Sequence, residues 1–271
     1  MLRRKIPGSG FLSRLFDKHQ ILVKNAYGVN MKLDPEEYLE KEIIATGYYE
    51  PEVIDRLISA AQGISQPVLW DIGANVGLHS LTFKKVFPTS TVCCFEPFHS
   101  NFMKLATNET LNPEIRLLKF NFGLSKQIEV NNIYTTSANA GRTSFMKLED
   151  TKDLGIHILS CDGNYIVDQK LAPYPDIIKI DVEDLELAVF QGSTKILDNP
   201  KLKTIIFEGP AEMPADDKVV DFLRKYGFDI TMVQRDRLEA ETNRNYVAVK
   251  NNTVSRDVNP IITVQSTFIA S

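Results

Sequence analysis

The chain has 271 residues, of which 43% are hydrophobic and 24% charged, a composition typical of a folded protein with a sizeable core. It carries 31 Lys and Arg against 35 Asp and Glu, so its formal net charge of −4 gives no support to a nucleic-acid partner. No apolar run is long enough to span a bilayer, and Cys93, Cys94 and Cys161 have no metal-ligand spacing. These features predict a cytoplasmic protein with reduced thiols and no integral membrane segment.

The first 50 residues have the features of an extension rather than of a domain. Short strand-like runs in residues 20–34 predict a hairpin, and helical spacing in residues 36–62 predicts two helices separated near Gly47. We predict that residues 1–50 pack on a main domain of residues 51–250. Residues 251–271 are polar and are predicted to form a tail.

Strands and helices alternate from Val68 onward. Apolar runs predict core strands at 68–72, 91–95, 115–120, 177–180 and 202–207. Helical periodicity predicts helices at 76–87, 98–110, 184–197 and 215–226. The order predicts an α/β fold with a mostly parallel, doubly wound sheet and helices on both faces.

Two regions depart from this alternation. Residues 128–147 are polar and extended, and a further strand is predicted at 156–160. The strands predicted at 228–233 and 246–249 are joined by a charged loop with no room for a helix of normal length. Strands joined in this way are antiparallel neighbours, so we predict an antiparallel last strand.

An acid and two glycines follow the first core strand, in the sequence DIGANVG of residues 71–77. Gly73 and Gly77 allow a ligand to approach the backbone closely, and the charge of Asp71 disfavours a phosphate there. Glu96 ends the next strand about 20 residues later, where a carboxylate can accept hydrogen bonds from both ribose hydroxyls. Together they predict a nucleoside-cofactor site. The alternative is a strand–helix connection with incidental glycines, and the Gly-x-x-x-Gly spacing differs from that of dinucleotide sites.

Acidic residues also follow two later strands. Asp181 and Glu183 come after the strand at 177–180, and we predict that one of them orients the substrate or takes a proton. His79, early in the first helix of the main domain, is a reserve base. Asp184 and Glu186 are better explained by the preference of acids for a helix N-terminus. Glu208 is predicted to lie beside Asp181, but because no third ligand is evident we predict no metal site.

In this order, the motifs resemble the FkbM-type family of S-adenosylmethionine-dependent methyltransferases. The matching stretches are residues 71–77, 95–97, 123–125, 139–144 and 179–183, with Gly192 and the strand end at Glu208, and residues 47–51 resemble the approach to the domain. The resemblance implies a Rossmann-like class I methyltransferase fold with a seven-stranded sheet. One departure is Asp184, because the family usually has glycine at this position.

The resemblance also implies a cofactor and an activity. The cofactor would be S-adenosyl-L-methionine, with Gly73, Asn75 and Gly77 at its amino-acid end, Glu96 at the ribose, and Asn121 and Gly123 near the adenine. Asp71 would belong to a site for the cationic ammonium and sulfonium groups. The implied activity is O-methylation of a hydroxyl on a sugar, a glycan or a natural product.

Two other functions remain open at this point. The first is an oxidoreductase with a nicotinamide cofactor, which the glycine spacing and the antiparallel ending disfavour. The second is a catalytically silent S-adenosylmethionine-binding or scaffold protein, a reading that Asp184 keeps open. A nucleic-acid methyltransferase is disfavoured, because the Asn/Asp-Pro-Pro-Tyr motif is absent and the net charge is negative.

Overall fold

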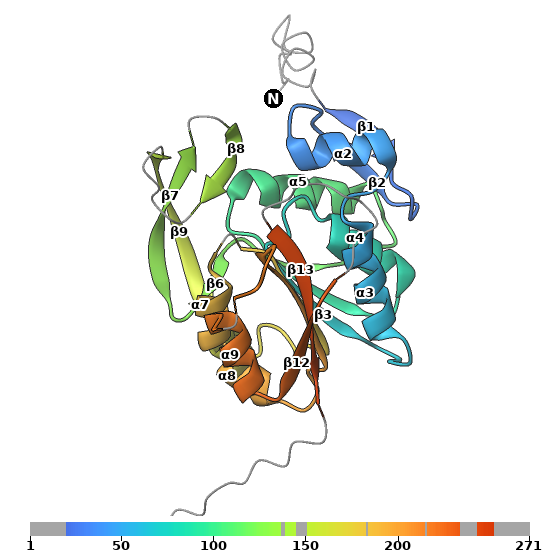
Figure 1. Cartoon of the computed structure of the whole chain (residues 1–271). Coiled ribbons are helices and arrows are strands. Elements are labelled where there is room, and N and C mark those ends of the chain that lie inside the picture. Colours follow the sequence, from blue (N-terminus) through green and yellow to red (C-terminus); the bar gives the residue numbers. More distant parts are fainter. Residues whose placement is uncertain are drawn as a thin grey trace, which may run out of the picture.

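A seven-stranded sheet lies at the centre of the chain (Figure 1). This computed structural model describes residues 20–136, 139–144, 151–182, 184–214, 216–233 and 243–251. The strand order is β12 (Phe228–Met232), β13 (Asn243–Lys250), β11 (Thr204–Pro210), β10 (Ile177–Ile180), β3 (Val68–Ile72), β4 (Thr91–Phe95), β5 (Leu118–Phe120). β13 is antiparallel to both of its neighbours, whereas the other pairs are parallel. The predicted mostly parallel sheet with an antiparallel last strand is therefore confirmed.

The central strands bury side chains on both faces, which is why they read as continuous apolar runs. In β3, Val68, Trp70 and Ile72 belong to one hydrophobic cluster, and Leu69 belongs to the cluster on the opposite face. The first cluster is covered by α6 (Gly163–Asp168), α7 (Glu186–Gln191), α8 (Thr194–Asp198) and α9 (Lys218–Lys225). The second is covered by α3 (Pro51–Ala61), α4 (Leu78–Val86) and α5 (His99–Thr110). Helices thus cover both faces, as predicted.

The helix predicted over 184–197 is instead two short helices, α7 and α8. Gly192 ends α7, and Ser193 begins α8. A Cβ atom on Gly192 would lie 2.0 Å from the carbonyl oxygen of Ser125, so the backbone of β6 (Gly123–Ser125) packs directly on this residue. The break follows from this long-range contact, which helical periodicity does not report.

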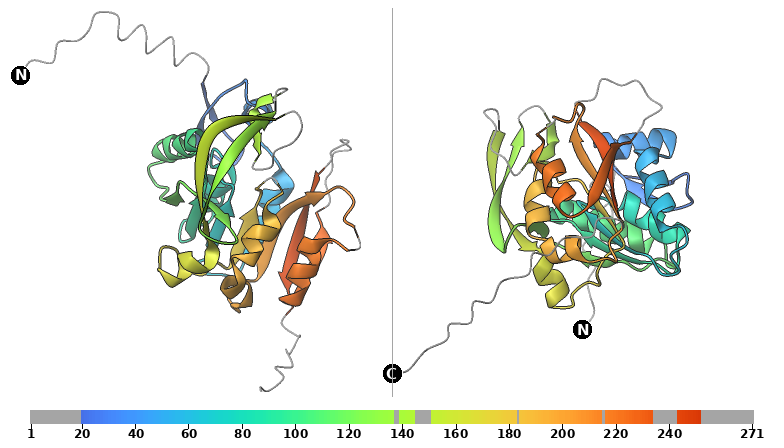
Figure 2. Two further views of the ribbon diagram at one scale, coloured as in Figure 1. Left: turned by 90° about the vertical axis from the view of Figure 1, so that its left-hand side faces the viewer. Right: turned by 60° about the horizontal axis from the view of Figure 1, so that its bottom comes forward.

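A second sheet stands beside the first and contains the polar region after residue 120 (Figure 2). Its order is β6, β9 (Thr151–Asp162), β7 (Glu129–Thr136), β8 (Asn139–Ser144). The strand predicted at 156–160 is the end of the longer β9, which pairs with both β6 and β7. Asp162 then caps α6, accepting a hydrogen bond of 2.8 Å from the Tyr165 amide.

Residues 20–49 pack against α4 and α5. The hairpin of β1 (Ile21–Lys24) and β2 (Asn30–Leu33) buries Met31 and Leu33 in the same cluster as those helices. In α2 (Tyr38–Thr46), the buried Glu40 forms a 2.5 Å ion pair with Lys104 of α5. Leu39, in the first turn of α2, lies near Gly73 and Asp181, which follow β3 and β10 at the carboxyl edge of the central sheet.

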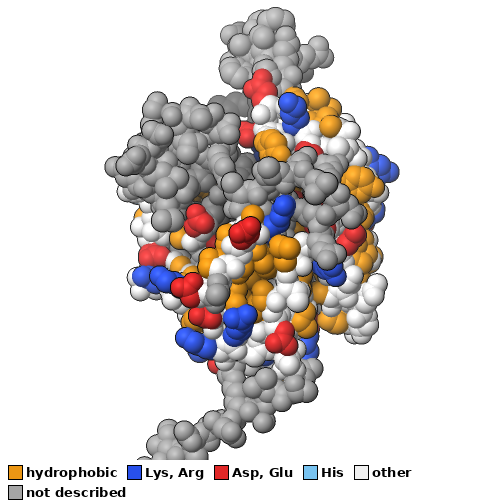
Figure 3. All heavy atoms as spheres, viewed as in Figure 1, with side chains coloured by type: hydrophobic (Ala, Val, Ile, Leu, Met, Phe, Trp, Pro, Cys, Tyr) orange, Lys and Arg blue, Asp and Glu red, His pale blue; other side chains and the backbone are white. Residues whose placement is uncertain are grey.

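On the face of the molecule shown in Figure 3, hydrophobic side chains gather over β12 and β13 beside α9. Phe222 and Ile230 are partly buried there against the core, while Met232 is half exposed at 51%. Among the described helices, none has the length and apolar character needed to cross a bilayer.

The buried Asn108 joins the hairpin, α5 and the turn after β3, because its Oδ1 accepts from the Lys32 amide at 2.7 Å and its Nδ2 donates to the Val76 carbonyl at 3.0 Å. We expect Asn108→Leu to lower the free energy of unfolding by roughly 2–4 kcal/mol, since the Lys32 amide and the Val76 carbonyl would both lose this hydrogen bond and the second is buried. Urea denaturation measures the loss. Thr107→Ala is the control, because this exposed neighbour bonds only within α5. Equal losses in the two variants would contradict this role of Asn108.

Candidate active site

The turn between β3 and α4 brings the carboxyl ends of three strands together. Gly73, Asn75 and Gly77 have φ values of 78°, 49° and 88°, in the left-handed region that favours glycine. The amides of Gly73 and Ala74 both donate to the Phe95 carbonyl at the end of β4, at 2.9 and 3.2 Å. The turn therefore bends back over the neighbouring strand, as an approach to a ligand requires.

Gly73 has a second constraint, from β10. A Cβ atom on Gly73 would lie 1.9 Å from the Asp181 carbonyl oxygen, so only glycine allows the turn and the end of β10 to approach this closely. The Asp181 amide donates to the Ile72 carbonyl at 3.0 Å and holds the same two segments together. The glycine-bearing turn and the acid after β10 are thus in direct backbone contact.

Asp71 lies beneath the turn and is fully buried. Its Oδ2 accepts a hydrogen bond of 2.5 Å from the Ser80 hydroxyl. Its Oδ1 has no hydrogen-bond partner among the described residues but lies 3.7 Å from Lys179 Nζ. Burial raises the pKa of the Asp71 carboxyl, and Lys179 and Ser80 oppose this rise. The sequence predicts Asp71 as a cofactor-site residue, and the structure places its carboxylate in the interior, against Ser80 and Lys179.

Lys179 is the residue that the sequence analysis did not identify. Its side chain is 6% exposed, and its Nζ donates to the Gly73 carbonyl at 3.1 Å and to Asp181 Oδ2 at 3.3 Å. Burial lowers the pKa of the Lys179 ammonium group, but the carboxylates of Asp181 and Asp71 raise it by more. The net pKa lies above the ordinary value, so the group stays a cation. A lysine within the apolar run Ile-Ile-Lys-Ile was the available signal, because a buried lysine requires charged partners.

Glu96 closes the turn from the side of β4. It is buried, and its two oxygens accept from the Asn75 amide at 2.8 Å and the Phe98 amide at 2.9 Å. Burial raises the pKa of the Glu96 carboxyl to about 7 against these two amides. Asn121 Nδ2 donates to the Glu96 carbonyl at 2.9 Å, so the structure brings these two predicted residues together.

Gly123 lies further along, against the second sheet. A Cβ atom there would lie 3.0 Å from Ser160 Oγ and 3.6 Å from Pro97 Cβ, so the glycine permits β6 to pack beside the strand end that carries Glu96. The space beside the Gly123 Cα atom is therefore filled by Ser160 and Pro97.

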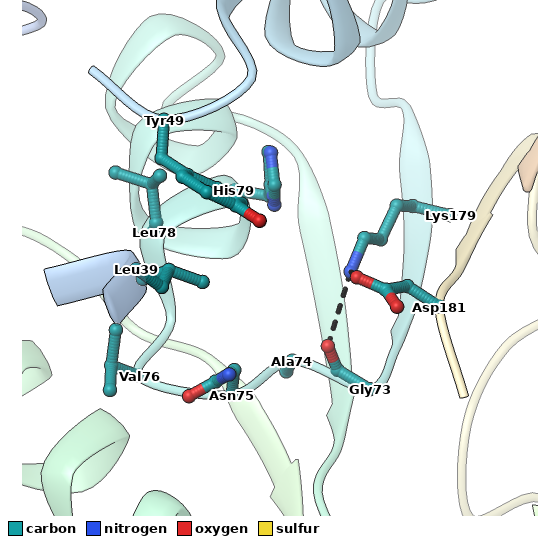
Figure 4. Close-up of a pocket in the computed structure, with 10 residues that line it drawn as sticks. All are labelled: Leu39, Tyr49, Gly73, Ala74, Asn75, Val76, Leu78, His79, Lys179 and Asp181. Atoms are coloured by element: carbon teal, nitrogen blue, oxygen red, sulfur yellow. Dashed lines mark hydrogen bonds and ion pairs between the residues drawn. The ribbon is translucent and has the colours of Figure 1, made fainter. Parts of the chain in front are cut away.

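A pocket opens over the turn, and two of the three predicted bases, Asp181 and His79, line it (Figure 4). The residues that line it are Leu39, Tyr49, Gly73, Ala74, Asn75, Val76, Leu78, His79, Lys179 and Asp181. The Asp181 side chain is 39% exposed, which leaves its carboxylate accessible beside Lys179. Glu183, the other predicted base, lies outside the described residues.

His79 lines the pocket as a neutral imidazole. It is only 7% exposed, and its Nε2 has no hydrogen-bond partner among the described residues. Burial, together with the nearby Lys179 cation, lowers its pKa well below the ordinary value. A neutral ring can accept or donate a hydrogen bond to a ligand.

Three further acids, Asp184, Glu186 and Glu208, are not among the residues that line the pocket. In the parallel register, Ile180 is opposite Phe207, so Asp181 and Glu208 follow at the same level of neighbouring strands. Asp184 has a φ of 71°, a conformation that explains why the family usually has glycine there and that Asp tolerates better than most residues. Glu186 accepts from the Val182 amide at 3.3 Å, and burial raises its pKa to about 7. Among the described residues, no three His, Cys, Asp or Glu side chains are grouped to hold a metal ion.

The strand order, the antiparallel last strand and the glycine-bearing turn define the class I methyltransferase fold. A solved structure of an S-adenosylmethionine-dependent methyltransferase from Agrobacterium tumefaciens has the same fold, with a TM-score of 0.50 and 9% identity, covering 86% of this chain and 70% of that one. The family model for the methyltransferase FkbM domain matches residues 71–230. The chain therefore belongs to the FkbM methyltransferase family and is a methyltransferase.

Two characterised relatives agree with this assignment. The hexuronic acid methyltransferase AglP of Haloferax volcanii is 26% identical over 187 residues, which cover 69% of this chain and 74% of that protein. The methyltransferase sdnD of Sordaria araneosa is 25% identical over 233 residues, covering 74% and 88%.

The close approach of the turn to β10 can be tested with two glycines that share a left-handed backbone. Gly73 has a φ of 78° and no room for a Cβ atom, whereas Gly63 has a φ of 82° and nothing within 4 Å of that position. We expect Gly63→Ala to lower the free energy of unfolding by about 1 kcal/mol from backbone strain alone. Gly73→Ala adds the clash with Asp181 and should cost about 2 kcal/mol more in chemical denaturation. Equal losses would show that the contact is relieved at little cost.

Proposed function

We propose that this methyltransferase transfers a methyl group from S-adenosyl-L-methionine to a hydroxyl oxygen of a sugar, a glycan or a natural product. The observation that carries the proposal is the accessible Asp181 carboxylate in a pocket formed by the glycine-bearing turn. The relative whose name specifies hexuronic acid supports a sugar-containing acceptor. Residues 51–250 would form the catalytic unit, with residues 1–50 packed on it.

The residues of the turn suit the proposed cofactor. Gly73, Asn75 and Gly77 would shape the surface for its amino-acid end, and Asn121 and Gly123 lie at the position proposed for the adenine. Glu96 is fixed by two amides and retains lone pairs that can accept from two ribose hydroxyls. S-Adenosylmethionine supplies, when bound, a methyl carbon attached to a positively charged sulfur. The acids at this edge of the sheet are complementary to that charge.

Asp181 is the proposed general base. An alcohol is a poor nucleophile, so a carboxylate within reach should take its proton as the oxygen attacks. Lys179 lies 3.3 Å from Asp181 Oδ2 and holds the carboxylate in one orientation. His79 is the reserve, because its neutral imidazole lines the same pocket. Glu183 keeps the same proposed role from its place two residues after Asp181.

A binding and turnover screen tests the function. Thermal unfolding is compared with S-adenosylhomocysteine, with NAD and without ligand, and stabilisation by S-adenosylhomocysteine alone is expected. Labelled S-adenosylmethionine is then supplied with p-nitrophenyl β-D-glucoside, p-nitrophenyl β-D-glucuronide and a panel of hydroxylated natural products, and products are examined by mass for one added methyl group. Stabilisation by NAD alone would overturn the proposal. Binding of S-adenosylhomocysteine without methylation of any acceptor would favour a silent binding protein.

Replacement of Asp181 tests the base. We expect Asp181→Asn to lower kcat by about 10²–10⁴-fold, because the amide cannot take the acceptor proton. The Kd for S-adenosylhomocysteine, from isothermal titration calorimetry, should stay within about threefold of the wild-type value, since the carboxylate is proposed to act on the acceptor. Asp184→Gly removes a nearby acid at a left-handed position and should keep its kcat. An undiminished kcat in Asp181→Asn would transfer the role to Glu183 or His79.

The raised pKa of Glu96 predicts a pH dependence of cofactor binding. Because the folded protein holds this proton more tightly than the ordinary value of 4.5 allows, ionising Glu96 lowers stability as pH rises from 4.5 to about 7. The ionised carboxylate is also the better acceptor for ribose hydroxyls, so affinity for S-adenosylhomocysteine should rise severalfold from pH 6 to pH 8. Calorimetry at several pH values measures this rise.

The control for this dependence is Glu186, whose pKa is also raised to about 7 by burial. Glu96→Gln should remove the pH dependence of affinity, whereas Glu186→Gln should preserve it. A dependence that survives in Glu96→Gln would assign the titration to another group.

A further inference from the structure

The segment between α2 and α3 contributes a wall of the pocket that the proposed chemistry has not used. It carries the sequence Gly47-Tyr-Tyr-Glu50, and Tyr49 lines the pocket together with His79, Lys179 and Asp181. Figure 4 shows the Tyr49 hydroxyl pointing into the pocket, towards Lys179 and Asp181. Tyr49 therefore lines the same pocket as the proposed base.

The backbone that presents Tyr49 is held in an unusual conformation. Glu50 has a φ of 47° and a ψ of 59°, a left-handed conformation at a residue that is neither glycine nor asparagine. Such conformations persist only where the surrounding structure enforces them, and they are concentrated at functional sites. Two contacts enforce this one. Glu50 begins α3, its carbonyl accepting from the Val53 amide at 3.0 Å, and its Oε1 accepts from Asn245 Nδ2 at 2.8 Å.

Asn245 connects this segment to the acceptor side of the sheet. It is 6% exposed on β13 and lies opposite Glu208 of β11 in the antiparallel register. Glu208 follows its strand at the level of Asp181. The contact between Glu50 and Asn245 thus fixes Tyr49 relative to the strand ends that carry the proposed base, although these segments are far apart along the chain.

The electrostatic surroundings suit a hydroxyl that donates. Burial raises the pKa of Tyr49, and the carboxylates of Glu50, Asp181 and Glu208 raise it further, so the phenol remains protonated. Lys179, Asp181 and the ring of His79 face the same space. A protonated phenol there can donate to a hydroxyl or ether oxygen of a bound acceptor.

We propose that Tyr49 is a specificity-determining residue for the acceptor, donating a hydrogen bond to an acceptor oxygen next to the one that is methylated, and that Glu50 and Asn245 are positioning residues for it. This inference rests on the proposed function. It concerns the acceptor alone, because Glu96 and the glycine-bearing turn are proposed to hold the cofactor. An acceptor with vicinal oxygens, such as a sugar, would offer one oxygen to Asp181 and its neighbour to Tyr49.

The test compares two adjacent tyrosines, using the acceptor methylated most rapidly in the screen above. Tyr48 is 41% exposed and is not among the residues that line the pocket. Its ring packs edge-on against the ring of Tyr27, with 6.0 Å between the ring centroids. We expect Tyr49→Phe to raise the acceptor KM roughly five- to tenfold, the effect of one lost hydrogen bond, with Tyr48→Phe unchanged. Calorimetry of the same acceptor with the S-adenosylhomocysteine-loaded protein should show an equal loss of affinity, while the Kd for S-adenosylhomocysteine is unchanged in both variants.

Substitutions at Glu50 separate positioning from folding. Glu50→Gly relieves the left-handed strain but removes the contact with Asn245, so we expect an unchanged or raised Tm together with a raised acceptor KM. Glu50→Gln retains an oxygen that accepts from Asn245 and should keep the wild-type KM. A wild-type KM in both Tyr49→Phe and Glu50→Gly would overturn the inference while leaving the proposed function intact. A wild-type protein that methylates no acceptor would overturn both.

Discussion

One buried cation determines how the site is built. Lys179 Nζ lies within 3.7 Å of Asp71 Oδ1 and 3.3 Å of Asp181 Oδ2, and it also donates to the Gly73 carbonyl. Removing such a cation would leave Asp71 as an uncompensated charge in a fully buried position, a change that costs about 3–5 kcal/mol in comparable pairs. The shape of the turn and the orientation of the acid after β10 are therefore parts of one arrangement.

This arrangement changes the interpretation of Asp71. The sequence predicts that Asp71 belongs to a site for a cationic cofactor, and in the structure its carboxylate lies beneath the turn, with Ser80 and Lys179 as its partners. Its negative charge is largely offset by the lysine. Asp71 would then act on the chemistry through Lys179, by holding that cation beside Asp181, whose side chain is 39% exposed and accessible to a ligand.

The sequence predicted those features of the fold that local patterns determine. Buried runs located the central strands, and the residues that follow β3, β4 and β10 were expected at one edge because parallel strands share a carboxyl edge. It did not predict features that depend on distant contacts. Gly192 divides a helix because Ser125 packs on it, and the role of Lys179 depends on Asp71 and Asp181, which the fold brings to its side chain. The contribution proposed for Tyr49 depends on the register between β11 and β13, which no short motif encodes.

The pocket consequently has two parts of different origin. The turn, His79, Lys179 and Asp181 lie within residues 71–230, which the family model matches, whereas Leu39 and Tyr49 come from the chain before that range. Changes in the preceding segment can alter the wall that faces an acceptor while the turn is kept, because side-chain contacts such as Glu40 with Lys104 join the two parts. Selectivity for the acceptor and the chemistry of methyl transfer can thus vary separately, which is the physical reason to look for acceptor recognition in the segment that carries Tyr49.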